Sequence, residues 1–192
     1  FQKVLDEEGV RLTEKEYYEK YLGLDDKGVF TEILKANGRP ISGSFLQNLI
    51  RRKNRGIKQE AQKGSLLLPG VEGFVKKAAA QGPVGIVSGA LRDEIVLMLG
   101  KTGLKEYFQV IVSAEDVKNG KPNPEGFLLG LKKTVAHFRK KIRAAETLVI
   151  EDSPWGIEAA RRAGMKCLAV TNSYKKKDLE KADWRITSLE NY

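Results

Sequence analysis

Histidine and cysteine are almost absent from this chain of 192 residues, which has one of each, His137 and Cys167. A single cysteine excludes a disulfide framework and every metal site built on several cysteines. A single histidine argues against a histidine-rich zinc site and against a catalytic pair of cysteine and histidine. Carboxylates, hydroxyls and lysines are therefore the side chains from which catalytic chemistry must be built.

Long hydrophobic runs are also absent. The longest, at residues 95–99, covers less than two helical turns, whereas a membrane-spanning helix needs about 20 apolar residues. Hydrophobic residues still make up 41% of the chain, which is enough for a core and unlike the composition of a disordered protein. The length allows one large domain, or one core with a small insert, and we expect no membrane partner.

Acidic residues are fewer than basic ones. The chain has 25 aspartates and glutamates and 34 lysines and arginines, for a formal net charge of +9. The basic residues cluster at 51–58, 132–143 and 175–177. Because no aromatic residue other than Phe138 is interleaved with them, these clusters offer no stacking platform for nucleic acid. We interpret them as solvated helix faces and expect no nucleic-acid partner. For the first cluster, the alternative is a surface that attracts anionic substrates.

Two styles of sequence meet near residue 66. Residues 1–66 have a helical, polar pattern, with a helix expected at 1–8, an apolar cluster at 17–22, and a longer helix from the expected N-cap Ser44 to Ile57. We interpret 1–66 as a small all-helical domain. Because the helix at 1–8 begins without a cap or a lead-in, we expect the natural chain to extend before residue 1.

From residue 67 to 192, short β-branched runs alternate with helices, which indicates βαβ units and a parallel sheet. We predict strands at 83–87, 110–112, 147–150, 167–170 and 184–186, and helices at 71–81, 91–99, 124–133 and 154–163. The expected fold class is therefore α/β, with a Rossmann-like parallel-sheet core at 67–192 and the helical domain at 1–66. Ligands of such a sheet bind beyond the carboxyl ends of its strands.

Ser88 and Gly89 follow the first predicted strand at this edge. The hydroxyl and the adjacent N–H groups suit a phosphate, although Ser88 alone is equally explained as the N-cap of the next helix. Lys121 lies in the turn Gly-Lys-Pro-Asn-Pro, where Asn123 and Pro124 are expected to start a helix. A fixed lysine there suits a phosphate, and the alternative is a solvated side chain.

Glu151 and Asp152 end the apolar strand at 147–150. Carboxylates at the rim of a buried strand are costly unless they are paired or bind a metal, and single oxygen ligands suit Mg²⁺. The alternative, favourable charge at a helix N-terminus, explains one of them but poorly explains both. A phosphate cradle, a cation and a Mg²⁺ carboxylate at one edge are the parts that phosphoryl transfer needs.

Ser88 after Ile-Val, Lys121 in Gly-Lys-Pro-Asn-Pro, and the stretch VIEDSPWGIEAARRAG at 149–164 resemble the second, third and fourth motifs of the haloacid dehalogenase superfamily. The similarity extends over nearly the whole chain. It is closest to phosphatases and phosphomutases similar to β-phosphoglucomutase, in which a helical cap domain is inserted early in the core. The resemblance implies that residues 1–66 are this cap domain.

The resemblance also implies roles for the residues at the sheet edge. Ser88 and the Gly89 amide would bind the phosphoryl oxygens, and Lys121 would neutralise them. Asp152 would be a Mg²⁺ ligand, with Glu151 beside it as a second ligand or behind it.

In the cap domain, Lys53 and Asn54 lie where related phosphomutases bind substrate groups. At Leu24-Asp25-Asp26, however, sugar-phosphate mutases tend to have an arginine, and at Leu91 a lysine is common. These departures favour hydrolysis over mutase activity.

The first motif of that superfamily, Asp-x-Asp-Gly-Thr/Val, does not occur in the 192 residues. It supplies the aspartate nucleophile and the general acid/base from a central strand. We expect the natural protein to have this strand between those ending at Val87 and Ile150, and both would have an unpaired edge without it.

The expected function is a Mg²⁺-dependent phosphatase that forms an aspartyl-phosphate and acts on a small phosphorylated metabolite. The alternatives are a phosphomutase of the β-phosphoglucomutase type and, in another class, a catalytically inactive binding protein. We expect a cytoplasmic monomer.

Overall fold

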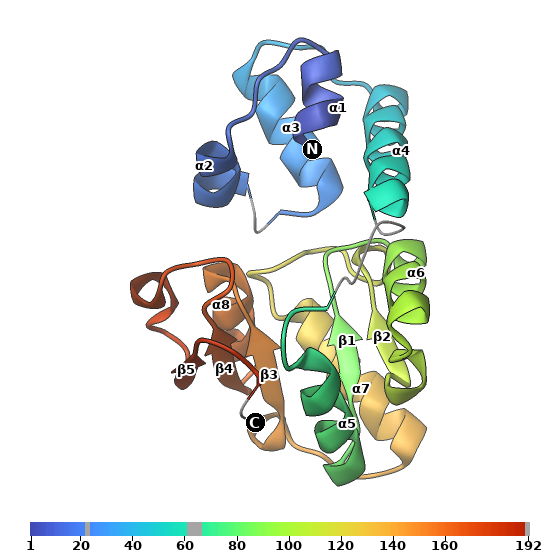
Figure 1. The fold of residues 1–192 in the computed structure, drawn as a ribbon, viewed down its shortest axis with the longest axis vertical. Helices are drawn as coiled ribbons and strands as arrows, with labels where there is room; N and C mark the ends of the chain where they lie inside the picture. The colour runs from blue at the N-terminus through green and yellow to red at the C-terminus, as the bar shows by residue number, and fades with distance from the viewer. Residues whose placement is uncertain (22–23, 61–66, 191–192) are drawn as a thin grey trace. The chain divides into compact units, whose positions relative to one another are not determined.

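Figure 1 shows the computed structural model, which describes residues 1–21, 24–60 and 67–190, apart from the side chains of Lys58 and Glu60. The chain forms two compact units, Phe1–Ser65 and Leu66–Tyr192, each with its own buried residues. Two predicted features touch residues outside the described ranges, namely Leu22 in the apolar cluster and the change of pattern at residue 66. Among the described helices, none combines the length and the apolar character needed to cross a bilayer.

The first unit contains helices and no strand among its described residues, as the sequence predicts. Its elements are α1 (Gln2–Glu7), α2 (Glu14–Glu16), a π-helical turn (Tyr17–Tyr21), α3 (Asp26–Ala36) and α4 (Gly43–Glu60). Apolar side chains of α1, α3 and α4 form its core, where Leu5, Phe30 and Leu49 are fully buried.

The first residues of α3 and α4 are determined by side-chain caps. Asp25 Oδ1 accepts the N–H of Gly28 at 2.7 Å and caps α3. At α4, Ser42 Oγ accepts the N–H of Phe45 at 3.2 Å, so the prediction of Ser44 as the N-cap is wrong. The helix begins earlier than expected because Ser42 makes the capping bond.

The second unit alternates strands and helices. In chain order these are α5 (Val71–Gln81), β1 (Gly85–Val87), α6 (Arg92–Thr102), β2 (Val110–Val112), α7 (Glu125–Phe138), β3 (Leu148–Glu151), α8 (Pro154–Arg162), β4 (Lys166–Val170) and β5 (Trp184–Ile186). Every strand and helix predicted for this region exists, and α5, β2 and β5 have the predicted ends. Helix α7 extends past its expected end at Lys133 to Phe138, and Thr134 Oγ donates to the Gly130 carbonyl at 2.8 Å inside the helix.

The strands form two parallel sheets. Strand β1 pairs with β2 in the register Ile86↔Ile111, and β4 lies between β3 and β5 in the second sheet. Within the described residues, β1 and β3 each have a strand partner on one edge only. The sequence predicts this result for a core that lacks a strand between those ending at Val87 and Ile150.

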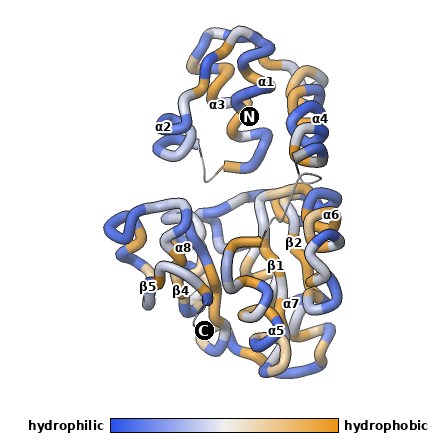
Figure 2. The backbone as a smooth tube through the Cα atoms, in the orientation of Figure 1, coloured by the Kyte–Doolittle hydropathy of each residue, from blue (hydrophilic) through white to orange (hydrophobic). Residues whose placement is uncertain are grey.

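Helices cover both faces of these strands, as an α/β fold requires. Ile86 packs with the cluster of α5 and α6, whereas the next residue, Val87, packs with the cluster of α7, α8, β3 and β4. Gly126 allows helix α7 to lie close to β1, since a Cβ at this position would be only 2.9 Å from Val87 Cγ1. Figure 2 shows the hydrophobic stretches of the strands that these helices cover.

Candidate active site

The residues that the sequence places at the sheet edge follow the carboxyl ends of strands or lie in the turn before a helix. Ser88 follows β1, Asp152 follows β3, and Lys121 lies in the turn before α7. The ammonium group of Lys121 binds Glu151 Oε1, which joins this turn directly to the end of β3. Two segments that are 30 residues apart in sequence therefore meet in one site.

Ser88 continues the β1–β2 ladder and does not cap the next helix. Its N–H donates to the Val112 carbonyl at 2.9 Å, and its Oγ accepts the N–H of Ala90 at 3.1 Å. The N-cap of α6 is Leu91, whose N–H donates to Glu94 Oε2, so the interpretation of Ser88 as an N-cap is wrong. The reason is that the turn Gly89–Leu91 separates the strand from the helix.

Gly89 is exposed, and a Cβ built on it would meet nothing within 4 Å. Its N–H has no hydrogen-bond partner within the described part of the chain. A turn that presents an N–H group beside a serine hydroxyl is the kind of concave backbone that binds anions.

Glu151 is a buried carboxylate with both oxygens engaged, and its side chain is only 6% exposed. Oε2 accepts the N–H of Asp152 at 3.0 Å, and the N–H and Oγ of Ser153 at 3.1 and 3.0 Å. Burial acts to raise the pKa of Glu151, but the Lys121 ammonium and these hydrogen bonds outweigh it and lower that pKa. Glu151 is therefore an anion that fixes both Lys121 and the loop containing Asp152.

Helix α8 accommodates this carboxylate because its first turn contains Gly156. A Cβ at Gly156 would lie 1.9 Å from Glu151 Cδ, which no real contact allows. Ser153 caps the same helix by accepting the N–H of Gly156 at 3.1 Å. The sequence Glu-Asp-Ser-Pro-Trp-Gly thus encodes a helix start built around a buried anion.

Lys121 is fixed from two sides. Besides its ion pair with Glu151, its Nζ lies 5.1 Å from the centre of the Phe127 ring, and its side chain is 24% exposed. The alternative of a solvated lysine is wrong for this residue. Asn123, the expected N-cap of α7, accepts the N–H of Glu125 at 2.9 Å, although the helix begins one residue later than predicted.

Asp152 is half-buried and has one engaged oxygen. Ser173 Oγ donates to Asp152 Oδ2 at 2.5 Å, while Oδ1 has no hydrogen-bond partner within the described ranges. Sequence reasoning missed Ser173, which follows β4 at the same edge as the other site residues. Its position three residues after a predicted strand was the available signal.

No cluster of three or more metal-binding side chains occurs in the described part of the chain. Mg²⁺ needs fewer, because it keeps several waters and is commonly bound through one or two carboxylates. The Oδ1 atom of Asp152 fits that requirement, whereas neither oxygen of Glu151 is available.

Lys53 and Asn54 lie on α4 in the first unit. Lys53 Nζ donates to Asp26 Oδ2 at 2.9 Å, and both side chains are largely buried, with 10% and 13% exposed. The sequence does not predict this ion pair. The ion pair gives both Asp26 and Lys53 a structural role.

Cys167 does not contribute nucleophilic chemistry. Burial in β4 raises its pKa to about 12, and the nearby carboxylates of Glu151 and Asp183 act in the same direction. The thiol is protonated at neutral pH, in agreement with a site built from carboxylates, hydroxyls and lysine.

Comparison with known proteins agrees with the motifs. A family model described as haloacid dehalogenase-like hydrolase matches residues 1–170. The chain is 37% identical over 124 residues to the putative phosphatase YhcW of Bacillus subtilis, covering 64% of this chain and 52% of that protein. It is 34% identical over 107 residues to validoxylamine A 7'-phosphate phosphatase of Streptomyces hygroscopicus subsp. limoneus, covering 56% and 47%. The chain thus spans about half the length of these curated relatives.

The fold also has solved counterparts. A crystal structure of β-phosphoglucomutase from Clostridium difficile superposes with a TM-score of 0.83 at 22% identity, covering 99% of this chain and 82% of that one. At this identity the likeness concerns the fold.

Proposed function

The chain belongs to the haloacid dehalogenase-like hydrolase family, and on that premise we propose that it acts as a Mg²⁺-dependent phosphatase for a small phosphorylated metabolite. The observation that carries this proposal is that the buried Glu151 binds both Lys121 and the loop of Asp152, which follows the carboxyl end of β3 as Ser88 follows that of β1. The phosphatase names of its relatives support the same reaction class.

The phosphate of the substrate binds between the turn after β1 and Lys121. Ser88 Oγ and the Gly89 N–H donate to the phosphoryl oxygens, and the Lys121 ammonium neutralises the charge that develops on them. Glu151 positions Lys121. Because Glu151 is buried, we place it on the side of the ammonium group away from the substrate. Such fixed donors need no reorganisation during the reaction, which is the main source of rate enhancement in phosphoryl transfer.

Asp152 is the residue that would bind Mg²⁺, through Oδ1, with Ser173 fixing its other oxygen. When bound, the metal supplies further neutralisation of the phosphoryl oxygens. Glu151 has no free oxygen for the metal, so of its two predicted roles we propose the one behind the ligand.

The nucleophile is an aspartate outside these 192 residues, on a strand that pairs with the unpaired edges of β1 and β3. This placement would put it between Ser88 and Asp152, the two residues that directly follow those strands. Its carboxylate attacks the phosphorus as the bond to the substrate oxygen breaks, the leaving oxygen takes a proton from the general acid of the same motif, and water then hydrolyses the aspartyl-phosphate.

Residues 1–66 act as the cap domain. Lys53 and Asn54 are its predicted substrate contacts, but because Lys53 is largely buried and bound to Asp26, Asn54 is the candidate that we retain. The alternative, a phosphomutase, needs a second phosphate site. Asp25 caps α3 and Asp26 binds Lys53, so the positions where mutases tend to have an arginine contain structural acids here. This favours hydrolysis. The cytoplasmic location and the monomeric state remain predictions.

The test uses the natural protein that contains this chain. We expect it to release phosphate from sugar phosphates or other small phosphate esters with Mg²⁺, and to lose the activity with EDTA. Lys121→Ala should lower kcat at least about 100-fold, because it removes a fixed cation from the transition state. Lys118→Ala, in the same exposed loop, is the control and should change kcat less than about twofold.

Absence of phosphate release from a broad panel of phosphate esters would overturn the proposal. Formation of an isomeric sugar phosphate, followed by ³¹P NMR, would instead identify a phosphomutase.

A further inference from the structure

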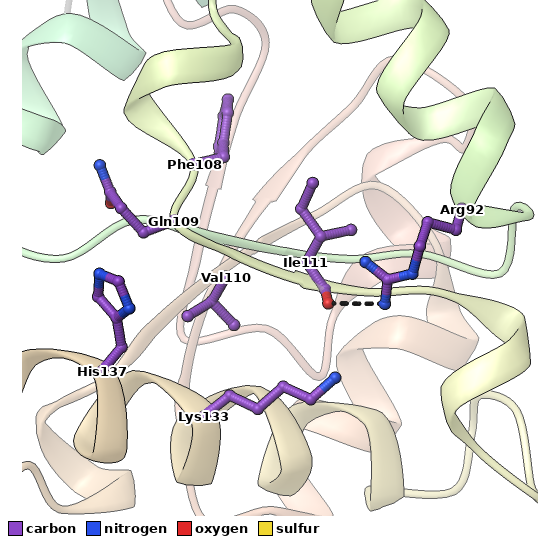
Figure 3. A pocket seen from close by; sticks show the side chains of 7 residues that line it. All are labelled: Arg92, Phe108, Gln109, Val110, Ile111, Lys133 and His137. Atoms are coloured by element: carbon purple, nitrogen blue, oxygen red, sulfur yellow. Dashed lines mark hydrogen bonds between the residues drawn. The ribbon is translucent and has the colours of Figure 1, made fainter.

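A pocket of about 330 Å³ lies along the outer edge of β2, among residues that the proposed reaction does not use. The Val112 carbonyl accepts the N–H of Ser88, directly after β1, so the carbonyl of the preceding residue, Ile111, points to the opposite edge of the strand. The guanidinium of Arg92 donates to that carbonyl at 3.3 Å (Figure 3). The pocket is therefore formed by the start of α6, the edge of β2 and the facing side of α7.

Two cations converge at one end of this pocket. Arg92 and Lys133 extend toward each other from α6 and α7 in Figure 3, with side chains 42% and 37% exposed. Both bind Asp116, through Oδ2 at 2.5 Å and Oδ1 at 3.1 Å. Asp116 is not a lining residue, so it fixes the two cations without entering the pocket.

Asp116 does not use every donor of the two cations, since Nε and Nη1 of Arg92 have no hydrogen-bond partner within the described residues. The Ser113 N–H, with Lys133, the Ser113 hydroxyl and Arg92, holds the pKa of Asp116 well below its usual range, so Asp116 is an anion at neutral pH. Two cations then share one negative charge. Glu115 is also near, since its Oε2 accepts the backbone N–H of Arg92 at 2.7 Å, but no carboxylate lines the pocket itself.

Away from the two cations, the pocket is lined by the polar Gln109, by apolar side chains and by an imidazole. Val110 and Phe108 form part of the wall, and His137 lies one helical turn beyond Lys133 on α7 (Figure 3). His137 is exposed and has no hydrogen-bond partner within the described residues. A ligand that fills the pocket would contact cations at one end and an imidazole at the other.

We propose that this pocket is a second anion site, which binds a small phosphate-bearing ligand with the phosphate group between Arg92 and Lys133. A phosphate dianion matches two converging cations, and the body of an organic phosphate would lie against Val110 and Phe108. An added peptide strand fits less well, because Arg92 already occupies the Ile111 carbonyl that such a strand would use. The site shares no residue with Ser88, Lys121 or Asp152 and does not rest on the proposed reaction.

The single histidine provides the test. The imidazole proton resonance of His137, assigned by its loss in His137→Gln, is followed by NMR at pH 7.5 while inorganic phosphate is added at constant ionic strength. We expect a saturable shift with a dissociation constant on the order of 1 mM. Lys133→Gln should weaken binding about 10-fold, whereas Lys132→Gln, the exposed neighbour on α7, should leave it unchanged.

Lys121→Gln separates this pocket from the candidate active site and should leave the His137 titration unchanged. In a second titration, phenylphosphonate replaces phosphate. Tighter binding of phenylphosphonate would identify an organic phosphate as the ligand, whereas equal binding would identify free phosphate. No saturable shift up to about 20 mM phosphate, or an equal shift in Lys133→Gln, would overturn the proposal.

Discussion

The two clusters of charge in the second unit use their carboxylates in different ways. At the candidate active site, one lysine meets one buried carboxylate, whose second oxygen is occupied by the loop that follows it. At the edge of β2, one partly exposed carboxylate meets an arginine and a lysine. The first arrangement is a buried pair whose carboxylate has both oxygens engaged, whereas the second is a partly exposed cluster that contains two cations. Glu151 therefore mainly fixes the positions of its neighbours, whereas the cluster around Asp116 mainly presents cations.

The substitution with the largest expected effect is Gly156→Ala, which tests the fixed arrangement around Glu151. Its methyl group would overlap Glu151 Cδ, so the carboxylate or α8 must move and a buried ion pair is disturbed. We expect a loss of at least about 3 kcal/mol in the free energy of unfolding, measured by urea denaturation. Gly73→Ala in α5, where a Cβ meets nothing within 4 Å, is the control and should stabilise by about 0.5 kcal/mol. Equal effects of the two substitutions would refute the account of α8.

Asp116→Asn tests the other cluster, with an expected loss of about 2 kcal/mol at pH 7, since two cations lose their shared anion. The pKa of Asp116 is lowered by folding, so its contribution is present above the unfolded pKa of about 4 and is lost as the pH falls below it. The wild type should therefore lose more stability than the variant between about pH 5 and pH 3. Urea denaturation across this range measures the difference, and parallel curves would contradict the assignment.

The smallest expected effect concerns Ser173, which fixes Asp152 across two loops. In the natural protein, Ser173→Ala should weaken Mg²⁺ binding about 10-fold, because an oriented ligand becomes free to rotate. Isothermal titration calorimetry measures this directly, with the stability nearly unchanged. Thr147→Ala, directly before β3 and so at the opposite end of that strand, is the control. Unchanged affinity in Ser173→Ala would remove Ser173 from the site.

Local signals explain what the sequence could predict. Helix α5 and strand β2 are bounded by glycine, polar residues and changes of periodicity, so their ends were predictable. The start of α4 was not, because Ser42 and Ser44 flank Gly43 and either could cap it. Ser88, Lys121 and Asp152 were predicted as site residues because the carboxyl ends of parallel strands share an edge.

Long-range pairings were beyond such reasoning. The bond from Ser173 to Asp152 joins residues 21 apart, and that from Lys121 to Glu151 joins residues 30 apart. Nothing in the local pattern of either segment specifies its partner. The same holds for Asp116, whose partners Arg92 and Lys133 come from two different helices.

The unpaired edges of β1 and β3 couple the stability of this core to whatever segment pairs with them. A strand that binds the folded core and not the unfolded chain stabilises it by mass action, in proportion to the logarithm of its effective concentration. When the strand is covalently attached that concentration is high, and folding and assembly of the nucleophile become a single equilibrium. A core that lacks the strand instead presents two open backbone ladders, which favour association with other copies. Catalytic competence and resistance to aggregation would then depend on the same hydrogen bonds.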